Sequence, residues 1–197
     1  MNLELSVVRY ASPALCKIKP ACLFSVPLSA FFAQDSSDCK KHLKLMQDIL
    51  SKQDTKITYT KRGKNLLFLV YDETLLQEVL SATDSVRYLE QKGYPQNMGL
   101  DGILKELLLR LSVSRAFPHE VGLFLGYPVY DVIAFERDAG RNAKRTAYWQ
   151  VYGNVEEAEQ KAHLYRDCCS KCMKFWSCGV SVSEMCGTYR RFTGGIK

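Results

Sequence analysis

The sequence predicts an α+β protein with a small mixed or antiparallel sheet, an inserted helical block and a long C-terminal helix. A strand-like segment at 22–26 precedes a helical stripe and then a β-hairpin around Gly63. Short amphipathic segments fill 74–138, and helical spacing continues from 155 to 176. The order strand, helix, strand, strand also fits the split β-α-β plan of ferredoxin-like folds, which is one arrangement that the sequence allows.

The first elements alternate between strand and helix. Segment 22–26 is a short apolar run between Pro20 and Pro27, which is typical of a buried strand. Capping side chains at 35–38 precede a helix that we expect from about 38 to 52. Its apolar positions recur at helical spacing and are Cys39, Leu43, Met46, Ile49 and Leu50.

A β-hairpin is the clearest local signal. Segments 57–60 and 66–71 flank a turn in which Gly63 can supply the positive φ angle. The first arm alternates between apolar and polar residues, whereas the second is apolar throughout. We therefore expect the second arm to be the more central strand.

Short helices are expected between 74 and 138, because capping residues and glycines or prolines recur there. The signals are a capping box at Thr74–Gln77, a segment from Asp84 to Gly93, a leucine-rich stripe from Asn97 to Leu111, a segment from Pro118 to Gly126, and a short helix or strand at 131–137.

The C-terminal third begins with a strand-like segment. Residues 146–152 are aromatic and β-branched, which predicts one further strand with Tyr148 and Trp149 on opposite faces. A capping box at 154–157 then opens a long helix that ends near Trp176.

The composition excludes several classes of protein. The 197 residues are 47% hydrophobic, so we expect a single domain over 1–190 with a flexible tail at 191–197. Glu4 stands where a signal peptide carries basic residues, and the apolar stretch 21–33 is too short to cross a bilayer. We expect a cytoplasmic protein without a membrane span, whose eight cysteines are free thiols or metal ligands. The net charge of +6 is spread along the chain, so nucleic-acid binding is not expected.

Five blocks carry a resemblance to a known family. They are Ser-Pro-Ala-Leu-Cys-Lys-Ile-Lys-Pro-Ala-Cys-Leu-Phe-Ser at 12–25, Leu-Phe-Leu-Val-Tyr at 67–71, Phe-Pro-His-Glu-Val-Gly-Leu-Phe-Leu-Gly-Tyr-Pro at 117–128, Trp-Gln-Val-Tyr-Gly at 149–153 and Tyr-Arg-Asp-Cys at 165–168. Together they resemble the bacterial family known as domain of unknown function 3793. Gln150 departs from it, since we expect lysine there, and the cysteine-rich tail is denser. The resemblance implies a single cytoplasmic domain and brings no activity.

His119 and Glu120 are the first candidates for catalysis. At the start of a helix, His119 would meet free N–H groups that lower the pKa of an imidazole and favour its neutral form. A neutral imidazole can act as a base or bind a metal, with Glu120 orienting it. Leu123 stands where a His-Glu-x-x-His zinc helix needs its second histidine. The competing interpretation is structural. In it, Glu120 complements the helix dipole and His119 forms a hydrogen bond to the preceding loop.

Cys16 is a second catalytic candidate and Lys19 a candidate for ligand binding. Cys16 could pair with His119, and the neighbouring Lys17 and Lys19 would favour its thiolate. Lys19 precedes the buried strand and could bind an anionic ligand at the end of the sheet. The competing interpretations are a buried cysteine that fills space and a surface lysine whose stem covers apolar neighbours.

Tyr127 and Trp149 are further candidates for ligand binding. An aromatic row on the last strand could stack on a planar ligand such as a flavin, haem or nucleobase. Packing against helices is the competing interpretation.

The C-terminal cysteines are the most distinctive feature, and they could hold a metal. A zinc or iron–sulfur site could use four of five residues, namely Cys168, Cys169, Cys172, Cys178 and Cys186. Lys171 and Lys174 would stabilise thiolates there. However, a single Cys-x-x-Cys step is weak evidence for zinc, and Cys168 and Cys172 continue the stripe of a long helix, which favours core packing.

Two functional classes therefore stay open. The favoured one is an accessory protein that binds a small ligand or a protein partner in a pocket between the sheet and the helical block, near Lys19 and His119. The alternative is a Cys/His-dependent enzyme or a thiol-based metal or redox protein. The sequence specifies no cofactor.

Overall fold

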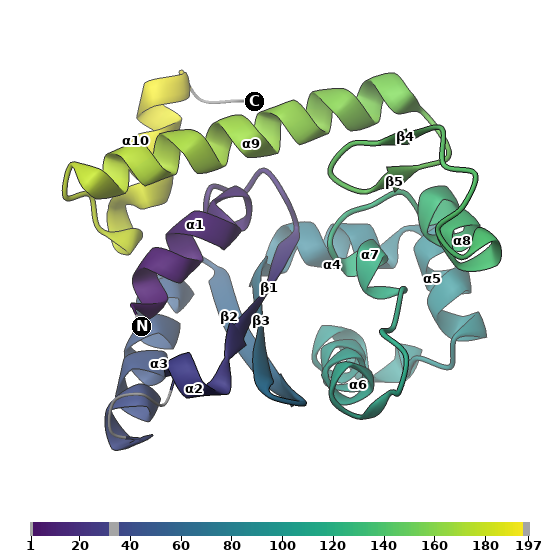
Figure 1. Ribbon diagram of the computed structural model, residues 1–197, viewed down its shortest axis with the longest axis horizontal. Helices are drawn as coiled ribbons and strands as arrows, with labels where there is room; N and C mark the ends of the chain where they lie inside the picture. Colours follow the sequence, from purple (N-terminus) through teal and green to yellow (C-terminus); the bar gives the residue numbers. More distant parts are fainter. Residues whose placement is uncertain (1, 32–35, 195–197) are drawn as a thin grey trace.

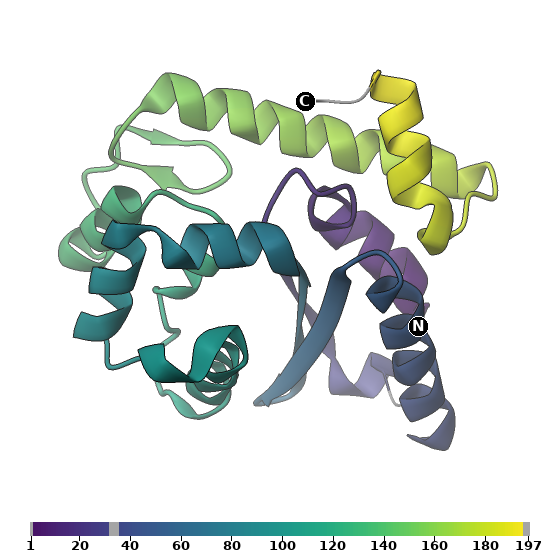
Figure 2. The same cartoon turned by 180° about the vertical axis from the view of Figure 1, so that it is seen from behind.

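The computed structural model describes residues 2–31 and 36–194, without the side chains of 36–40. A three-stranded antiparallel sheet lies in the middle of the molecule, and helices cover both of its faces (Figure 1). The same three layers are visible from behind (Figure 2). This confirms the predicted α+β class and its small antiparallel sheet.

The sheet contains β1 (Ala21–Pro27), β2 (Thr55–Arg62) and β3 (Asn65–Asp72) in the order β1-β3-β2. Both outer strands run antiparallel to β3, and Phe68 lies opposite Phe24 on one side and Tyr59 on the other. The strands β1 and β2 therefore run parallel to each other and are joined through α3 (Ser36–Ser51), which is a split β-α-β unit. The predicted hairpin and the central position of its second arm are confirmed.

The alternation of side chains on β3 divides the core into two clusters. Leu66, Phe68 and Val70 face a layer made of α1 (Leu3–Leu15), α3, the second half of α9 (Val155–Ser177) and α10 (Val182–Thr193). Leu67 and Leu69 face the helical block formed by α4 (Glu73–Ser81), α5 (Thr83–Gln91), α6 (Gly99–Val113) and α7 (Val121–Phe124). Both faces are buried, which explains why residues 66–71 of β3 are apolar throughout.

Helix α1 was not expected from the sequence, yet it positions two candidate residues. Its Val7, Val8 and Ala11 are fully buried, and α9 packs alongside it. The helix ends at Cys16, after which the chain folds back because the carbonyl of Pro13 accepts the N–H groups of both Ile18 and Lys19. Cys16 is thereby directed toward α9, and Lys19 enters the interior just before β1.

Several predicted helix starts are shifted. The cap of α4 is Asp72, whose carboxylate accepts the N–H of Leu75, so the capping box predicted at Thr74 is wrong. Asp84 lies inside the first turn of α5, and α6 begins at Gly99 after a short 3-10 turn, η1 (Gln96–Met98). The capping side chains predicted at 35–38 lie outside the side chains that the structure describes.

The last predicted strand is wrong. Residues 145–151 form a hairpin of two-residue strands, β4 (Arg145–Thr146) and β5 (Gln150–Val151), which pair only with each other among the described strands. The N–H of Ala147 donates to the carbonyl of Trp149, so the chain turns where a strand was expected. The fourth strand of a ferredoxin-like sheet is thus missing from the described sheet. The preceding segment is the helix α8 (Val129–Asp138).

The predicted long C-terminal helix is confirmed as α9, which Asn154 caps by accepting the N–H of Glu157. It extends from the β4–β5 hairpin to α10 (Figure 1). Helix α10 continues through Thr193, so it includes the first residues of the segment expected as a tail, and 195–197 lie outside the described residues. A short α2 (Leu28–Phe31) follows β1. Within the described ranges, no helix combines the length and apolarity that a membrane span requires.

Candidate functional site

An open pocket of about 330 Å³ lies between α7, α8 and the β4–β5 hairpin. We call it the aromatic pocket, because Phe117, Tyr127, Phe135, Tyr148 and Trp149 line it. His119 and Gln150 add polar atoms to its wall. Three of the four predicted ligand-binding residues, His119, Tyr127 and Trp149, therefore lie at one site.

The rings of Tyr127 and Trp149 stack at a centroid distance of 4.8 Å and an interplanar angle of 18°. Asp131 of α8 holds this arrangement. Its carboxylate accepts the indole N–H of Trp149 (2.6 Å) and the backbone N–H groups of Tyr152 (2.9 Å) and Gly153 (2.7 Å). The carboxylate is buried, and three donors compensate for its loss of water. Asp131 therefore fixes the hairpin against α8.

His119 lies at the exposed edge of the pocket. Its ring contacts Phe135 edge-on at 4.9 Å between centroids. It precedes α7, which has only four residues, so the helix dipole that was expected to act on its imidazole has little structural basis.

Glu120 lies apart from the pocket, although it is adjacent to His119 in sequence. It is buried and accepts hydrogen bonds from the Tyr94 hydroxyl (3.3 Å) and from Arg110 Nη1 (3.2 Å). Arg110 also binds Glu106 and the carbonyl of Lys92, both at 2.7 Å. Glu120 thus belongs to an ion-pair network that joins α6 to the turn before α7.

Lys19 is only 2% exposed, so it is not the surface lysine of the competing interpretation. Its Nζ lies 5.3, 4.8 and 5.5 Å from the ring centroids of Tyr127, Tyr148 and Tyr165. No carboxylate of the described residues pairs with it, and burial lowers its pKa. Because Tyr127 and Tyr148 also line the aromatic pocket, Lys19 places a buried amine behind the pocket wall.

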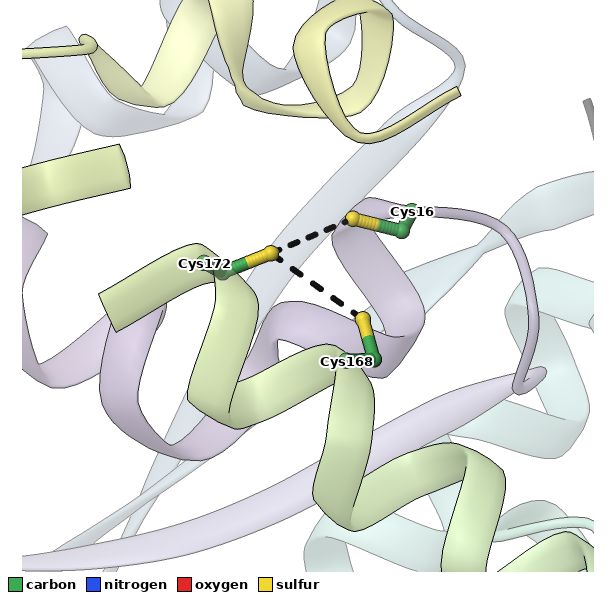
Figure 3. Close-up of side chains that lie close together, drawn as sticks. All are labelled: Cys16, Cys168 and Cys172. Atoms are coloured by element: carbon green, nitrogen blue, oxygen red, sulfur yellow. Dashed lines mark hydrogen bonds between the residues drawn. The ribbon is translucent and has the colours of Figure 1, made fainter. Parts of the chain in front are cut away.

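A second cluster contains three thiols, which we call the thiol cluster. Cys16 comes from the end of α1, while Cys168 and Cys172 lie one turn apart on α9 (Figure 3). The Sγ atom of Cys172 lies 3.6 Å from that of Cys16 and 4.0 Å from that of Cys168. All three side chains are at most 2% exposed. Cys16 therefore contacts two of the predicted metal ligands and does not line the pocket that contains His119.

The thiols perturb one another. Hydrogen bonds from Cys16 and Cys168 lower the pKa of Cys172, because both stabilise its thiolate. The hydrogen bonds to Cys168 and Cys172, together with burial, raise the pKa of Cys16.

The other predicted metal ligands lie elsewhere. Cys169 is half-buried on the side of α9 toward Lys19, Cys178 is exposed, and Cys186 belongs to α10. Among the side chains that the structure describes, the thiol cluster is the one group of three histidine, cysteine or carboxylate side chains whose ligand atoms come within 4.8 Å of one another. Lys171, expected to stabilise thiolates, instead pairs with Asp167 at 2.7 Å.

Sequence reasoning did not identify Asp131, Phe117 or Phe135 as site residues. Asp131 stands three positions after the family-like block at 117–128, and its position beside an aromatic segment was the available signal. Tyr189 of α10, which borders the thiol cluster, had no local signal at all.

The fold and these sites define an α+β protein with an aromatic pocket on one side of the molecule and a buried thiol cluster on the other. The chain belongs to the family described as protein of unknown function (DUF3793), whose model matches residues 7–186. The family resemblance seen in the sequence is thereby confirmed. Comparisons with curated proteins and with solved structures gave no match.

Proposed function

We propose that this protein is a cytoplasmic accessory protein that binds a flat, mostly apolar small molecule in the aromatic pocket. The observation that carries the proposal is the stacked pair of Tyr127 and Trp149, fixed by Asp131 in the wall of a pocket of about 330 Å³. That volume lies within the range of about 300–1,000 Å³ that is usual for small-molecule sites.

The chemistry of the pocket wall favours a particular class of ligand. Aromatic rings bind planar ligands by stacking, and the His119 imidazole and the Gln150 amide can hydrogen-bond a polar substituent. When it is protonated, Lys19 behind the Tyr127 and Tyr148 rings adds a positive potential. We therefore expect an aromatic ligand that carries a negative charge or an electron-rich substituent.

The residues that line the aromatic pocket fit a binding protein better than an enzyme. The side chains that line the pocket include no cysteine, serine or lysine that could act as a nucleophile. The one carboxylate among them, Asp131, uses its oxygens for three N–H donors. Among the residues that line the pocket, His119 thus has neither such a nucleophile nor a free carboxylate beside it. The occupant in this proposal is a small molecule, and nucleic acid is not expected to bind.

Calorimetric titration with 2-naphthoate tests the proposal, with saturated decahydro-2-naphthoate as a non-planar control. We expect 2-naphthoate to bind with a Kd of about 0.1–1 mM, since a ligand of this size gains about 0.3 kcal/mol or more per heavy atom. The saturated analogue should bind at least about tenfold more weakly, because it cannot stack.

Two histidine variants locate the binding. His119→Ala should weaken the binding of 2-naphthoate several-fold, whereas His163→Ala, on the exposed face of α9, should leave it unchanged. Equal affinity for the flat and saturated probes, or equal effects of the two variants, would contradict the proposal.

A further inference from the structure

We propose that Cys16, Cys168 and Cys172 form a binding site for monovalent copper. The site is separate from the aromatic pocket and does not depend on the function proposed for it. Its ligands come from two segments more than 150 positions apart in sequence, which the packing of α1 against α9 brings together (Figure 3).

The sulfur positions fit a bound ion. A thiolate–metal bond is about 2.3 Å long, so two sulfurs on one ion are separated by about 3.8 Å in a tetrahedral site and about 4.0 Å in a trigonal one. Cys172 Sγ lies 3.6 Å from Cys16 Sγ and 4.0 Å from Cys168 Sγ, and no pair in the cluster exceeds 4.8 Å. These separations are those of sulfurs that share one ion, so the cluster is close to the size that a bound ion requires.

The buried hydroxyl of Tyr189, which has no hydrogen-bond partner among the described groups, is a second, independent observation. Tyr189 is only 1% exposed, and its hydroxyl has no well-formed hydrogen bond to the described groups. It borders Cys168 and Cys16, and their proximity contributes to the raised pKa of this tyrosine, after burial itself. A phenol without a partner in the core is unfavourable. It gains one if Cys168 becomes an anionic, metal-bound thiolate, to which the O–H can donate.

The donor set favours monovalent copper over zinc. Soft thiolates select Cu(I) and zinc over harder ions. Structural zinc sites almost always have four ligands drawn from cysteine, histidine and carboxylates. Among the described side chains, the three thiols have no fourth group of that kind within reach. Three sulfurs in a dry environment therefore match an ion that accepts three-coordination.

Burial also explains why the ion should be retained. The three thiols are shielded from water, and no lysine or arginine of the described chain pairs with them. Isolated thiolates are costly in such a place, so the positive charge of the ion is what allows the thiols to release their protons to solvent.

Anaerobic competition for Cu(I) tests the proposal on the full-length, reduced protein. Cu(I) is supplied as its bathocuproine disulfonate complex, whose colour reports the copper that the protein has not removed. Wild type should remove one equivalent. Cys168→Ser and Cys172→Ser should weaken this binding at least about 100-fold, since each removes one of three ligands.

Two variants, one on α9 and one at its C-cap, are matched controls. Cys169→Ser and Cys178→Ser remove neighbouring thiols that lie outside the cluster, and they should still bind one equivalent. Circular dichroism of each metal-free variant establishes that it is folded. Equal losses in the controls, no removal of copper by wild type, or preferential binding of zinc at the same three residues would overturn the proposal.

X-ray absorption of the wild-type protein keeps the test decisive if the serine variants do not fold. With one equivalent of Cu(I) bound, the spectrum should show three sulfur neighbours and no nitrogen. Nitrogen in the first shell, or fewer than three sulfurs, would contradict the assigned ligands.

Discussion

Replacement of Asp131 by alanine should open the β4–β5 hairpin and destroy the aromatic pocket. The carboxylate is the shared acceptor for three N–H donors at 2.6, 2.9 and 2.7 Å. Its removal leaves the indole N–H of Trp149 and the backbone N–H of Tyr152 without their partner, in residues that are 9% and 4% exposed. Gly153 is less buried, so water can replace the carboxylate there.

The size of the effect follows from those two buried donors. Each unsatisfied buried donor costs about 1–3 kcal/mol. The closed hairpin should therefore become less stable, relative to the open one, by about 2–6 kcal/mol. The global loss is smaller, because the hairpin can open locally and hydrate its donors while the three-stranded sheet stays folded.

Hydrogen exchange and fluorescence can measure this opening. The amides of 148–153 should exchange faster in Asp131→Ala, while those of β3 keep their protection. In a Trp176→Phe background Trp149 is the one remaining tryptophan, and its emission should shift to longer wavelength as it meets water. Asp48→Ala, an exposed site on α3, is the control and should change neither signal. Unchanged exchange and emission in Asp131→Ala would refute the proposed role of the carboxylate.

Three further predictions concern the core, the buried lysine and the thiol cluster. Leu107→Ala should lower the free energy of unfolding by about 2–5 kcal/mol, because Leu107 is fully buried; urea unfolding with an unchanged slope measures this. Burial lowers the pKa of Lys19, so burying its protonated amine destabilises the folded protein fully at low pH. This destabilisation disappears as pH rises toward about 10.4, the pKa of lysine in the unfolded chain. The stability of Lys19→Met relative to wild type should therefore decline over that range, and a constant difference would count against the shift. Tyr189→Phe should keep one Cu(I) site but weaken it about 10–100-fold in the same competition assay, since it removes a hydrogen bond to a ligand; unchanged affinity would show that the phenol does not contact the bound form.

The sheet was predictable where local pattern and environment agree. The second arm of the hairpin is apolar throughout, and burial on both faces is what its central position requires. The long helix after Asn154 was equally accessible, because its cap and its stripe lie close together in sequence. By contrast, the aromatic residues of 146–152 suggested a strand, whereas they serve to line a pocket from a tight turn.

The candidate sites were predictable only in part. The spacing of Cys168 and Cys172 placed them on one face of a helix, and their burial agrees with that. Nothing local joined them to Cys16, because that contact depends on the packing of α1 against α9. His119 and Glu120 are neighbours in sequence, yet one faces the pocket and the other enters the network of Arg110. Which way each side chain points is decided by tertiary packing and not by the motif.

The indole N–H signals of the two tryptophans offer the most direct test of ligand binding in the aromatic pocket. In a ¹H–¹⁵N spectrum of the wild-type protein titrated with 2-naphthoate, the signal of Trp149 should shift saturably. The signal of Trp176, which packs on the other side of the sheet, should stay in place. A shift of Trp176 alone, or no saturable shift of Trp149, would contradict the proposed binding site.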